Sequence, residues 1–296
     1  MAAPSSVTLL DGGMGQELTA RWDRPATPLW SADILAERPD LVEAVHDDFI
    51  AAGADVVTLA SYPVTPARLA EAGREGEFEA LQAAALEAGR RACARASRDV
   101  RLAGCLPPLS GSYRAQDRPG EAAALDQYAR IVDIQAREAD LFLCETLACV
   151  EEARWATRAA RASGRPVWTA LTVDDADGTR LRSGEPVIEA ARAAREEGAA
   201  AVLINCSTPE AASAGLDVLL SLDLDAGAYA NGFTSIDPLL ETGTVDALEA
   251  REDLGPQAYG DFAERWIASG AAIVGGCCEV GPAHIAEIAR RLGRTG

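Results

Sequence analysis

The sequence predicts an α/β protein that folds as one (β/α)8 TIM barrel, a single domain over residues 1–296. Three observations support this prediction. Eight short apolar runs alternate with eight stretches of helical period, as in a parallel sheet whose strands are joined by helices. No flexible linker or change of composition divides the chain. Its 296 residues also suit this fold, which typically takes about 250.

The apolar runs are the predicted strands. Each is short, and its apolar residues do not alternate regularly with polar ones, which is typical of parallel strands buried on both faces. In chain order they are Val7–Leu10, Val56–Ala60, Val100–Ala103, Leu141–Cys144, Val167–Leu171, Ala201–Ile204, Ala226–Ala230 and Ala272–Val274.

The stretches between the strands are the predicted helices, because their apolar residues recur at helical spacing. Several begin at proline, which is favoured in the first helical turn, and several end just before glycine. They are Pro39–Ala52, Phe78–Ala96, Glu121–Ala139, Glu151–Ser163, Pro186–Glu197, Pro209–Leu220, Pro256–Ser269 and Pro282–Leu292.

Strand counting alone leaves one competing fold, a doubly wound open sheet, which has the same alternation of strands and helices. Two connections that follow strands are long, residues 172–185 and 231–255. In a barrel they would lie on the face that carries the active site. There they either shape or cover the site as lids, or are tolerated surface insertions.

The chain is strongly acidic, with a formal net charge of −19 at pH 7. This charge argues against a nucleic-acid partner, whose phosphates need a basic face, and against an anionic membrane surface. No stretch has the apolar length of a membrane span, and no secretory signal is visible. With seven cysteines and no such signal, we expect a cytoplasmic protein with reduced thiols.

Three cysteines stand at the ends of two predicted strands. Cys206 follows one run, and Cys277 and Cys278 follow another, directly behind Gly275 and Gly276. Strand ends converge at the mouth of a barrel, so the three thiols would meet there. Three soft sulfur ligands suit zinc and leave a fourth position open. The sequence therefore predicts a Zn²⁺ site, with the glycine pair supplying the turn that lets adjacent ligands face one metal.

A site of three thiolates favours chemistry on a thiol. Zinc lowers the pKa of a thiol that binds to it, and the anionic site keeps that sulfur rich in electrons. Such a site is poorer than a histidine-rich one at producing hydroxide from water. Thiol alkylation therefore fits the predicted site better than hydrolysis does.

Polar residues at other strand ends are candidate substrate ligands. Asp11 and Glu145 could hold an ammonium group, while the backbone amides of Gly12 and Gly13 could hold a carboxylate. Asp11 could instead cap the following turn. Asn231 is either a support for a metal ligand or the first residue of an Asn-Gly turn.

The other thiols and both histidines are predicted to be structural, because none combines a strand-end position with a vicinal partner. Cys105 and Cys144 stand at strand ends without such a partner, and the rest lie in helices. These structural residues are Cys93, Cys105, Cys144, Cys149, His46 and His284.

Taken together, these motifs resemble the homocysteine S-methyltransferase family. The resemblance runs nearly from end to end, and its most specific parts are Asn205-Cys206 and Gly275-Gly276-Cys277-Cys278. The chain departs from the family pattern at Leu203, where glycine is frequent, and at Ala230, where proline is frequent. Further matching segments are residues 10–15, 29–31, 51–55 with His46, 60–62, 144–146, 231–232 and 270–271, with Tyr259 and Trp266.

The resemblance implies a zinc-dependent barrel that methylates the sulfur of homocysteine to give methionine. The implied methyl donor is a sulfonium or ammonium compound: S-methylmethionine, S-adenosylmethionine or a betaine. No cobalamin or folate module is visible, so direct transfer is expected, and the oligomeric state is left open. By the family pattern, Cys206, Cys277 and Cys278 hold zinc, while Asp11, Gly12, Gly13 and Glu145 hold the amino-acid end of homocysteine.

Two alternatives remain at the level of sequence. The first is a related methyltransferase that uses another thiol or another donor, which a panel of acceptors and donors would separate. The second is a non-catalytic zinc or thiol sensor built on the vicinal cysteines. A sensor would be favoured if homocysteine had no effect on the coordination of the metal.

Overall fold

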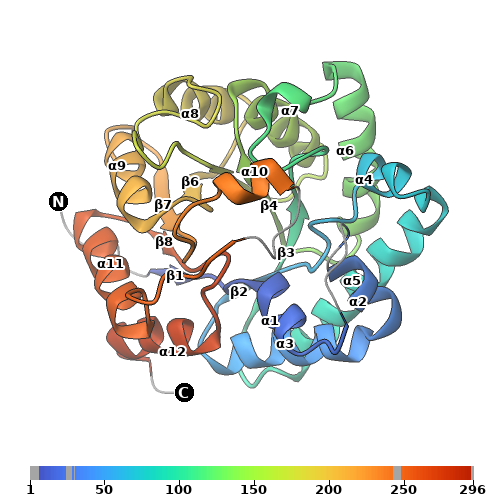
Figure 1. Cartoon of the computed structure of the whole chain (residues 1–296), viewed down its shortest axis with the longest axis horizontal. Helices are drawn as coiled ribbons and strands as arrows, with labels where there is room; N and C mark the ends of the chain where they lie inside the picture. The colour runs from blue at the N-terminus through green and yellow to red at the C-terminus, as the bar shows by residue number, and fades with distance from the viewer. Residues whose placement is uncertain (1–6, 25–28, 30, 243–247, 295–296) are drawn as a thin grey trace.

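The computed structural model describes residues 7–24, 29, 31–242 and 248–294. Its eight strands are parallel and follow the order β1-β8-β7-β6-β5-β4-β3-β2. A parallel bridge between Leu10 and Val56 joins the first and last strands of that order, so the sheet nearly closes on itself. Helices surround it on all sides (Figure 1). The predicted (β/α)8 barrel is confirmed, and the open sheet is excluded.

All eight predicted strands are present, with some differences in length. The third and fourth strands each end three residues beyond the predicted limit, since the predictions ended at Ala103 and Cys144. The strands are β1 Thr8–Leu9, β2 Val56–Thr58, β3 Arg101–Leu106, β4 Leu141–Leu147, β5 Val167–Leu171, β6 Ala201–Asn205, β7 Asp225–Tyr229 and β8 Ile273–Val274.

The predicted end of β4 at Cys144 is wrong because the strand contains a bulge. Cys144 pairs with Thr169 of β5, the register then shifts, and Leu147 pairs with Leu171. Within the shift, Thr146 has a φ of 61°. A bulge bends a strand and changes the direction of the side chains beside it. Glu145 therefore lies within β4, at an irregular point of the strand, rather than after its end.

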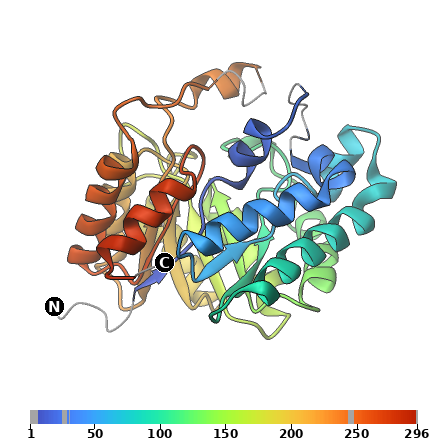
Figure 2. The ribbon, with the colours of Figure 1, turned by 90° about the horizontal axis from the view of Figure 1, so that it is seen from below.

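All eight predicted helices are present; one has the predicted bounds, and the others are one to four residues shorter. They are α3 Pro39–Ala51, α5 Phe78–Arg95, α6 Glu121–Gln135, α7 Val150–Arg161, α8 Val187–Glu196, α9 Pro209–Leu219, α11 Pro256–Ser269 and α12 Pro282–Arg291. The structure adds four short helices that the sequence pattern did not reveal: α1 Met14–Ala20, α2 Ser31–Glu37, α4 Pro66–Glu71 and α10 Asp237–Thr242. Figure 2 shows α1 and α10 at the same end of the barrel.

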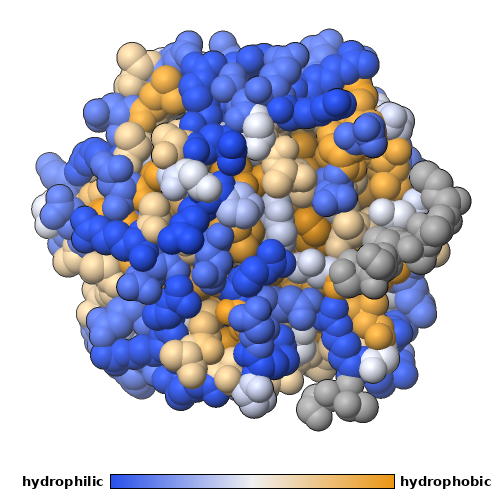
Figure 3. Space-filling view, turned by 180° about the vertical axis from the view of Figure 1, so that it is seen from behind, coloured by the Kyte–Doolittle hydropathy of each residue, from blue (hydrophilic) through white to orange (hydrophobic). Residues whose placement is uncertain are grey.

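Apolar side chains fill two regions, one inside the barrel and one between the barrel and its helices. The inner region fills the barrel below its mouth with side chains, as is usual for this fold. On the face opposite to that of Figure 1, hydrophilic side chains predominate, with apolar ones between them (Figure 3). None of the described helices is long and apolar enough to cross a membrane. The inner region includes Leu10, Val56, Leu143, Trp168, Leu203, Tyr229 and Ile273.

Candidate active site

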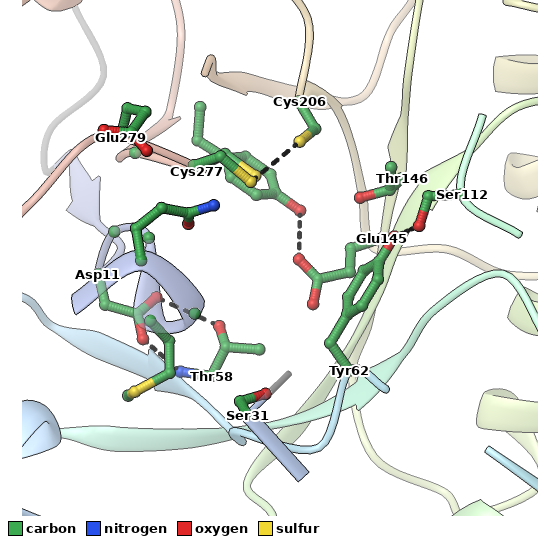
Figure 4. Close-up of a pocket in the computed structure, with 18 of the residues that line it drawn as sticks. Asp11, Ser31, Thr58, Tyr62, Ser112, Glu145, Thr146, Cys206, Cys277 and Glu279 are labelled. Carbon is green, nitrogen blue, oxygen red and sulfur yellow. Dashed lines mark hydrogen bonds between the residues drawn. The ribbon is translucent and has the colours of Figure 1, made fainter. Parts of the chain in front are cut away.

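A cavity of about 420 Å³ lies at the carboxyl ends of the strands. Its size is in the range of small-molecule sites. Residues of β2, β4 and β7 line it, together with residues that directly follow β1, β6 and β8, helix α1 and the connection after β7. Figure 4 shows its polar side chains facing a common space. The predicted site residues that line it are Asp11, Gly12, Gly13, Glu145, Cys206, Cys277 and Cys278.

The three predicted metal ligands are brought together. The sulfur atoms of Cys206, Cys277 and Cys278 all lie within 4.8 Å of one another, and those of Cys206 and Cys278 are 3.7 Å apart. Four ligands at about 2.3 Å around tetrahedral zinc would place two sulfurs about 3.8 Å apart. The donor set and its spacing therefore fit a thiolate-bound zinc ion with one open position.

Gly275 and Gly276 allow the vicinal cysteines to pack tightly at the barrel mouth. A Cβ atom at Gly276 would lie 2.1 Å from Val280, and one at Gly275 would lie 2.5 Å from Leu10. Neither glycine adopts a positive φ. The glycine pair is therefore explained by close packing, and the sharp glycine turn that the sequence suggested is not what positions the ligands.

The three thiols share charge even without a metal. The pKa of Cys206 is held well below its usual range because the thiols of Cys277 and Cys278 donate hydrogen bonds to it. The pKa values of Cys277 and Cys278 are raised well above theirs, since both give hydrogen bonds to the Cys206 sulfur and both lose much of their contact with water. The proton is therefore lost most easily from Cys206, which favours a cation beside its sulfur.

Two carboxyl groups lie across the cavity from the cysteines, one on buried Asp11 and one on half-buried Glu145. Asp11 accepts hydrogen bonds from the backbone N–H of Thr58 at 2.7 Å and from its hydroxyl at 3.3 Å. It therefore binds β2 rather than capping the turn that follows it. Glu145 accepts a bond from the Cys105 thiol at 3.0 Å and a long one from the Tyr229 hydroxyl at 3.5 Å. Neither carboxyl group has a positively charged partner among these contacts, so both are free to receive a cation.

These two groups predict a dependence of stability on pH. Burial raises the pKa of Asp11 to about 8 and that of Glu145 to about 7. In the unfolded chain, both carboxyl groups would lose their protons near pH 4. Their contribution to stability is therefore fully present below about pH 4 and is lost as the pH rises toward about 8.

In urea unfolding of the metal-free protein, we expect Asp11→Asn to flatten this decline between about pH 5 and pH 8. Asparagine resembles the protonated carboxyl group and keeps an oxygen for the Thr58 amide. Because the cysteines titrate in both proteins, the difference between the two slopes isolates Asp11. Equal slopes would contradict the assignment.

Two of the candidate substrate ligands make contacts within the protein, and for Asn231 these match the turn alternative. Asn231 is buried but does not line the cavity, and its side-chain oxygen accepts the backbone N–H of Phe233 at 3.2 Å, as in a turn. The Gly13 amide donates to the Val280 carbonyl at 2.9 Å and is therefore not free for a substrate carboxylate. Gly12 is required for close approach, since a Cβ atom there would lie 2.0 Å from the Val280 oxygen.

Several residues of the cavity wall escaped the sequence interpretation. Tyr113 places its hydroxyl 2.9 Å from the Cys206 sulfur, and half-buried Glu279 follows directly behind Cys278. In the described chain, only four residues other than glycine have a positive φ, and all four line this cavity. Backbone strain of this kind concentrates at functional sites. The four residues with a positive φ are Tyr113, Thr146, Cys206 and Glu279, and no periodic pattern in the sequence indicates this backbone conformation.

The residues predicted to be structural lie outside the cavity lining. Cys149 is the N-cap of α7, where its sulfur accepts the Glu152 amide at 3.5 Å. His46 is fully buried on α3, and His284 joins the first turn of α12 to Leu254. Cys105 also supports the site from behind the cavity wall, because its thiol donates to Glu145. That contact was not expected from its position in the sequence.

Comparison with known proteins points to one family. The homocysteine S-methyltransferase family model matches residues 8–292. The homocysteine S-methyltransferase of Escherichia coli K12 is 31% identical, covering 96% of this chain and 95% of the relative. Homocysteine S-methyltransferase YbgG of Bacillus subtilis 168 is 30% identical, covering 95% and 93%.

The fold agrees with this comparison. The metallated form of the homocysteine methyltransferase MmuM from Escherichia coli is similar with a TM-score of 0.81 at 29% identity, covering 97% of each chain. The apo form of MmuM gives a TM-score of 0.72 at 25% identity, covering 97% of this chain and 96% of that one. Since the family model and the relatives span almost the whole sequence, this chain belongs to the homocysteine S-methyltransferase family.

Proposed function

We propose that this chain is a zinc-dependent S-methyltransferase that moves a methyl group from a cationic donor to the thiol of homocysteine, giving methionine. The observation that supports this most strongly is that three cysteine sulfurs within 4.8 Å of one another share a cavity with the carboxyl groups of buried Asp11 and half-buried Glu145. The relatives named as homocysteine S-methyltransferases support the same acceptor.

The metal would be held by Cys206, Cys277 and Cys278, whose spacing fits zinc. When bound, zinc supplies the Lewis acid that lets a coordinated thiol lose its proton at neutral pH. The protein's own part is to hold the rest of the substrate. Glu145 and Asp11 would bind the ammonium group of homocysteine, because both line the cavity and neither has a basic partner among its hydrogen bonds.

Charge also supports a cationic methyl donor. No arginine, lysine or histidine is among the described residues that line the cavity. The homocysteine thiolate would attack the methyl carbon, and the electron pair of the breaking bond would stay on the donor sulfur or nitrogen. The donor loses its positive charge in that step, so an anionic cavity attracts the donor more than its product. We propose S-methylmethionine or S-adenosylmethionine as the donor, with betaines as the further class.

Glu279 is the carboxyl group that we propose for contact with the donor. It is half-buried, lines the cavity beside Cys278, and has a φ of 63°. We expect Glu279→Gln to raise the KM for a sulfonium donor about fivefold, the equivalent of about 1 kcal/mol for a partly exposed charge pair. The KM for homocysteine should change little. Glu252→Gln, at an exposed glutamate, is the matched control. Equal effects of the two substitutions on the KM for the donor would contradict a contact between Glu279 and the donor.

The assay that tests the proposed function measures methionine formed from homocysteine with each donor in turn. We expect turnover with a sulfonium donor and its loss after treatment with a zinc chelator. Turnover with a different thiol and none with homocysteine would favour a related methyltransferase. No turnover with any pair, and no effect of homocysteine on the bound metal, would favour a sensor.

The same proposal implies a reducing environment. All seven cysteines are free in the structure, and three of them must stay unpaired to bind a metal. The cytoplasm provides such an environment, because its thiol buffers keep cysteines reduced. We therefore propose a cytoplasmic role in methionine formation.

A further inference from the structure

Tyr113 is an aromatic side chain that contacts a predicted metal ligand. Its hydroxyl lies 2.9 Å from the Cys206 sulfur, and its side chain is buried. Its backbone has a φ of 64°, which a bulky residue adopts only when its surroundings enforce it. The position of Tyr113 is therefore imposed by contacts from outside its own loop.

Arg182 supplies one of those contacts. Its guanidinium lies over the Tyr113 ring, 5.2 Å from the ring centroid. The arginine side chain is only 9% exposed and pairs with Asp175 at 2.9 Å. A cation over the face of a tyrosine ring is attracted to its π electrons, more strongly when the pair is removed from water. Arg182 thus packs against one face of the ring, and its ion pair with Asp175 fixes its own position.

Both charged residues belong to the long connection after β5, and that connection is bound to the strand end that carries Cys206. The Thr172 hydroxyl donates to the Cys206 carbonyl at 3.2 Å. The Ser207 hydroxyl accepts the Val173 amide at 2.9 Å. Asp175 accepts the Thr208 amide at 2.8 Å. The chain at Cys206 and directly after it is therefore held by the same segment that holds Tyr113.

The connection is itself firmly packed. Val173 and Leu181 face each other in an antiparallel bridge, and both are fully buried. These contacts favour a fixed element over a mobile cover for residues 172–185. This connection contacts Cys206 in two ways: through hydrogen bonds to the chain at Cys206, and through Arg182, which packs on Tyr113.

We propose that residues 172–185 act as a brace for Cys206, and that Arg182 and Tyr113 are positioning residues that hold its sulfur and withdraw charge from it. The tyrosine hydroxyl donates a hydrogen bond to the sulfur, and the arginine charge lies behind the ring. A hydrogen bond to a ligand sulfur stabilises its lone pairs, and partners of this kind orient the ligand and tune the metal. The inference rests on the proposed function only in taking Cys206 as a metal ligand.

The test uses the full chain with Co²⁺ bound, because sulfur-to-cobalt charge transfer gives an absorption band in the near ultraviolet. We expect Tyr113→Phe to shift this band to lower energy, since the sulfur lone pairs lose a stabilising hydrogen bond. Removal of the metal by a chelator should become about 10- to 100-fold faster, as for other groups that support metal ligands. Arg182→Met should shift both readouts in the same direction by less, and Arg182→Lys should restore them.

Tyr62→Phe is the matched control, because Tyr62 also lines the cavity but its hydroxyl lies 2.9 Å from Ser112. The brace is overturned if Tyr113→Phe leaves the band and the chelation rate unchanged, or if Tyr62→Phe moves them equally. It is also overturned if Arg182→Met has no effect. If the unaltered protein shows no thiolate band with Co²⁺, the proposed metal site fails as well. If the unaltered protein shows the band but the Tyr113 and Arg182 variants do not shift it, the metal site stands and only the brace is rejected.

Discussion

Cys206→Ser is expected to abolish metal binding and methyl transfer together. The substitution removes one of three sulfur ligands that lie within 4.8 Å of one another and leaves a hard, protonated hydroxyl in its place. Even residues that only support metal ligands change affinity by about 10- to 100-fold, so we expect a loss greater than about 100-fold here. Zinc content per purified chain and methionine formation from homocysteine measure the two effects.

Cys149→Ser is the matched control for this experiment. Cys149 is also buried, but it lies outside the cavity and caps the start of α7 by accepting the Glu152 amide. Serine is a preferred residue at that position, so the helix should tolerate it. We expect Cys149→Ser to keep its zinc and its turnover. A Cys206→Ser protein that binds zinc normally and turns over at the full rate would refute the ligand assignment.

Glu145→Gln is expected to lower kcat/KM for homocysteine about 10- to 150-fold, the equivalent of the 1.5–3 kcal/mol for a hydrogen bond to a charged group. Glutamine keeps the shape of the side chain and an oxygen for the Cys105 thiol, but it carries no charge for the substrate ammonium group. Because that group is held equally before and during methyl transfer, most of the loss should appear in KM. Steady-state kinetics with varied homocysteine measure the effect.

A substrate without the ammonium group makes the Glu145 experiment specific. With 4-mercaptobutanoate as the thiol, the unaltered protein should be slow, and Glu145→Gln should slow it little further. The two changes remove the same interaction, so their effects should not add. If Glu145→Gln slows both thiols by the same factor, Glu145 serves the site in another way than by binding the ammonium group.

The barrel was predictable because its signals are local and repeated. Each strand is a short apolar run, and each long helix has enough turns to show its period. The helices α1, α2, α4 and α10 have only six or seven residues, too few for a periodic pattern. The bulge in β4 also escaped prediction, since it depends on the pairing of Leu147 with Leu171. Such pairing is a property of the assembled sheet.

The cysteine cluster was predictable for a related reason. Once a barrel is assumed, the ends of β6 and β8 must converge, so Cys206 is brought to the vicinal cysteines. Tyr113 gave no such signal, because its place depends on an unusual φ and on contacts with a distant connection. The structural alternative for Asn231, a turn, matches its bond to Phe233. Strand-end position thus identifies candidates, and hydrogen-bond partners decide among them.

A single-turnover experiment in metal-stripped and zinc-restored protein tests the central claim most directly. Homocysteine and S-methylmethionine are mixed with each preparation, and the methionine formed is measured against time. We predict no burst of methionine from the stripped protein and full recovery as zinc approaches about one ion per chain. Methionine formed at an undiminished rate by protein without zinc would contradict the account.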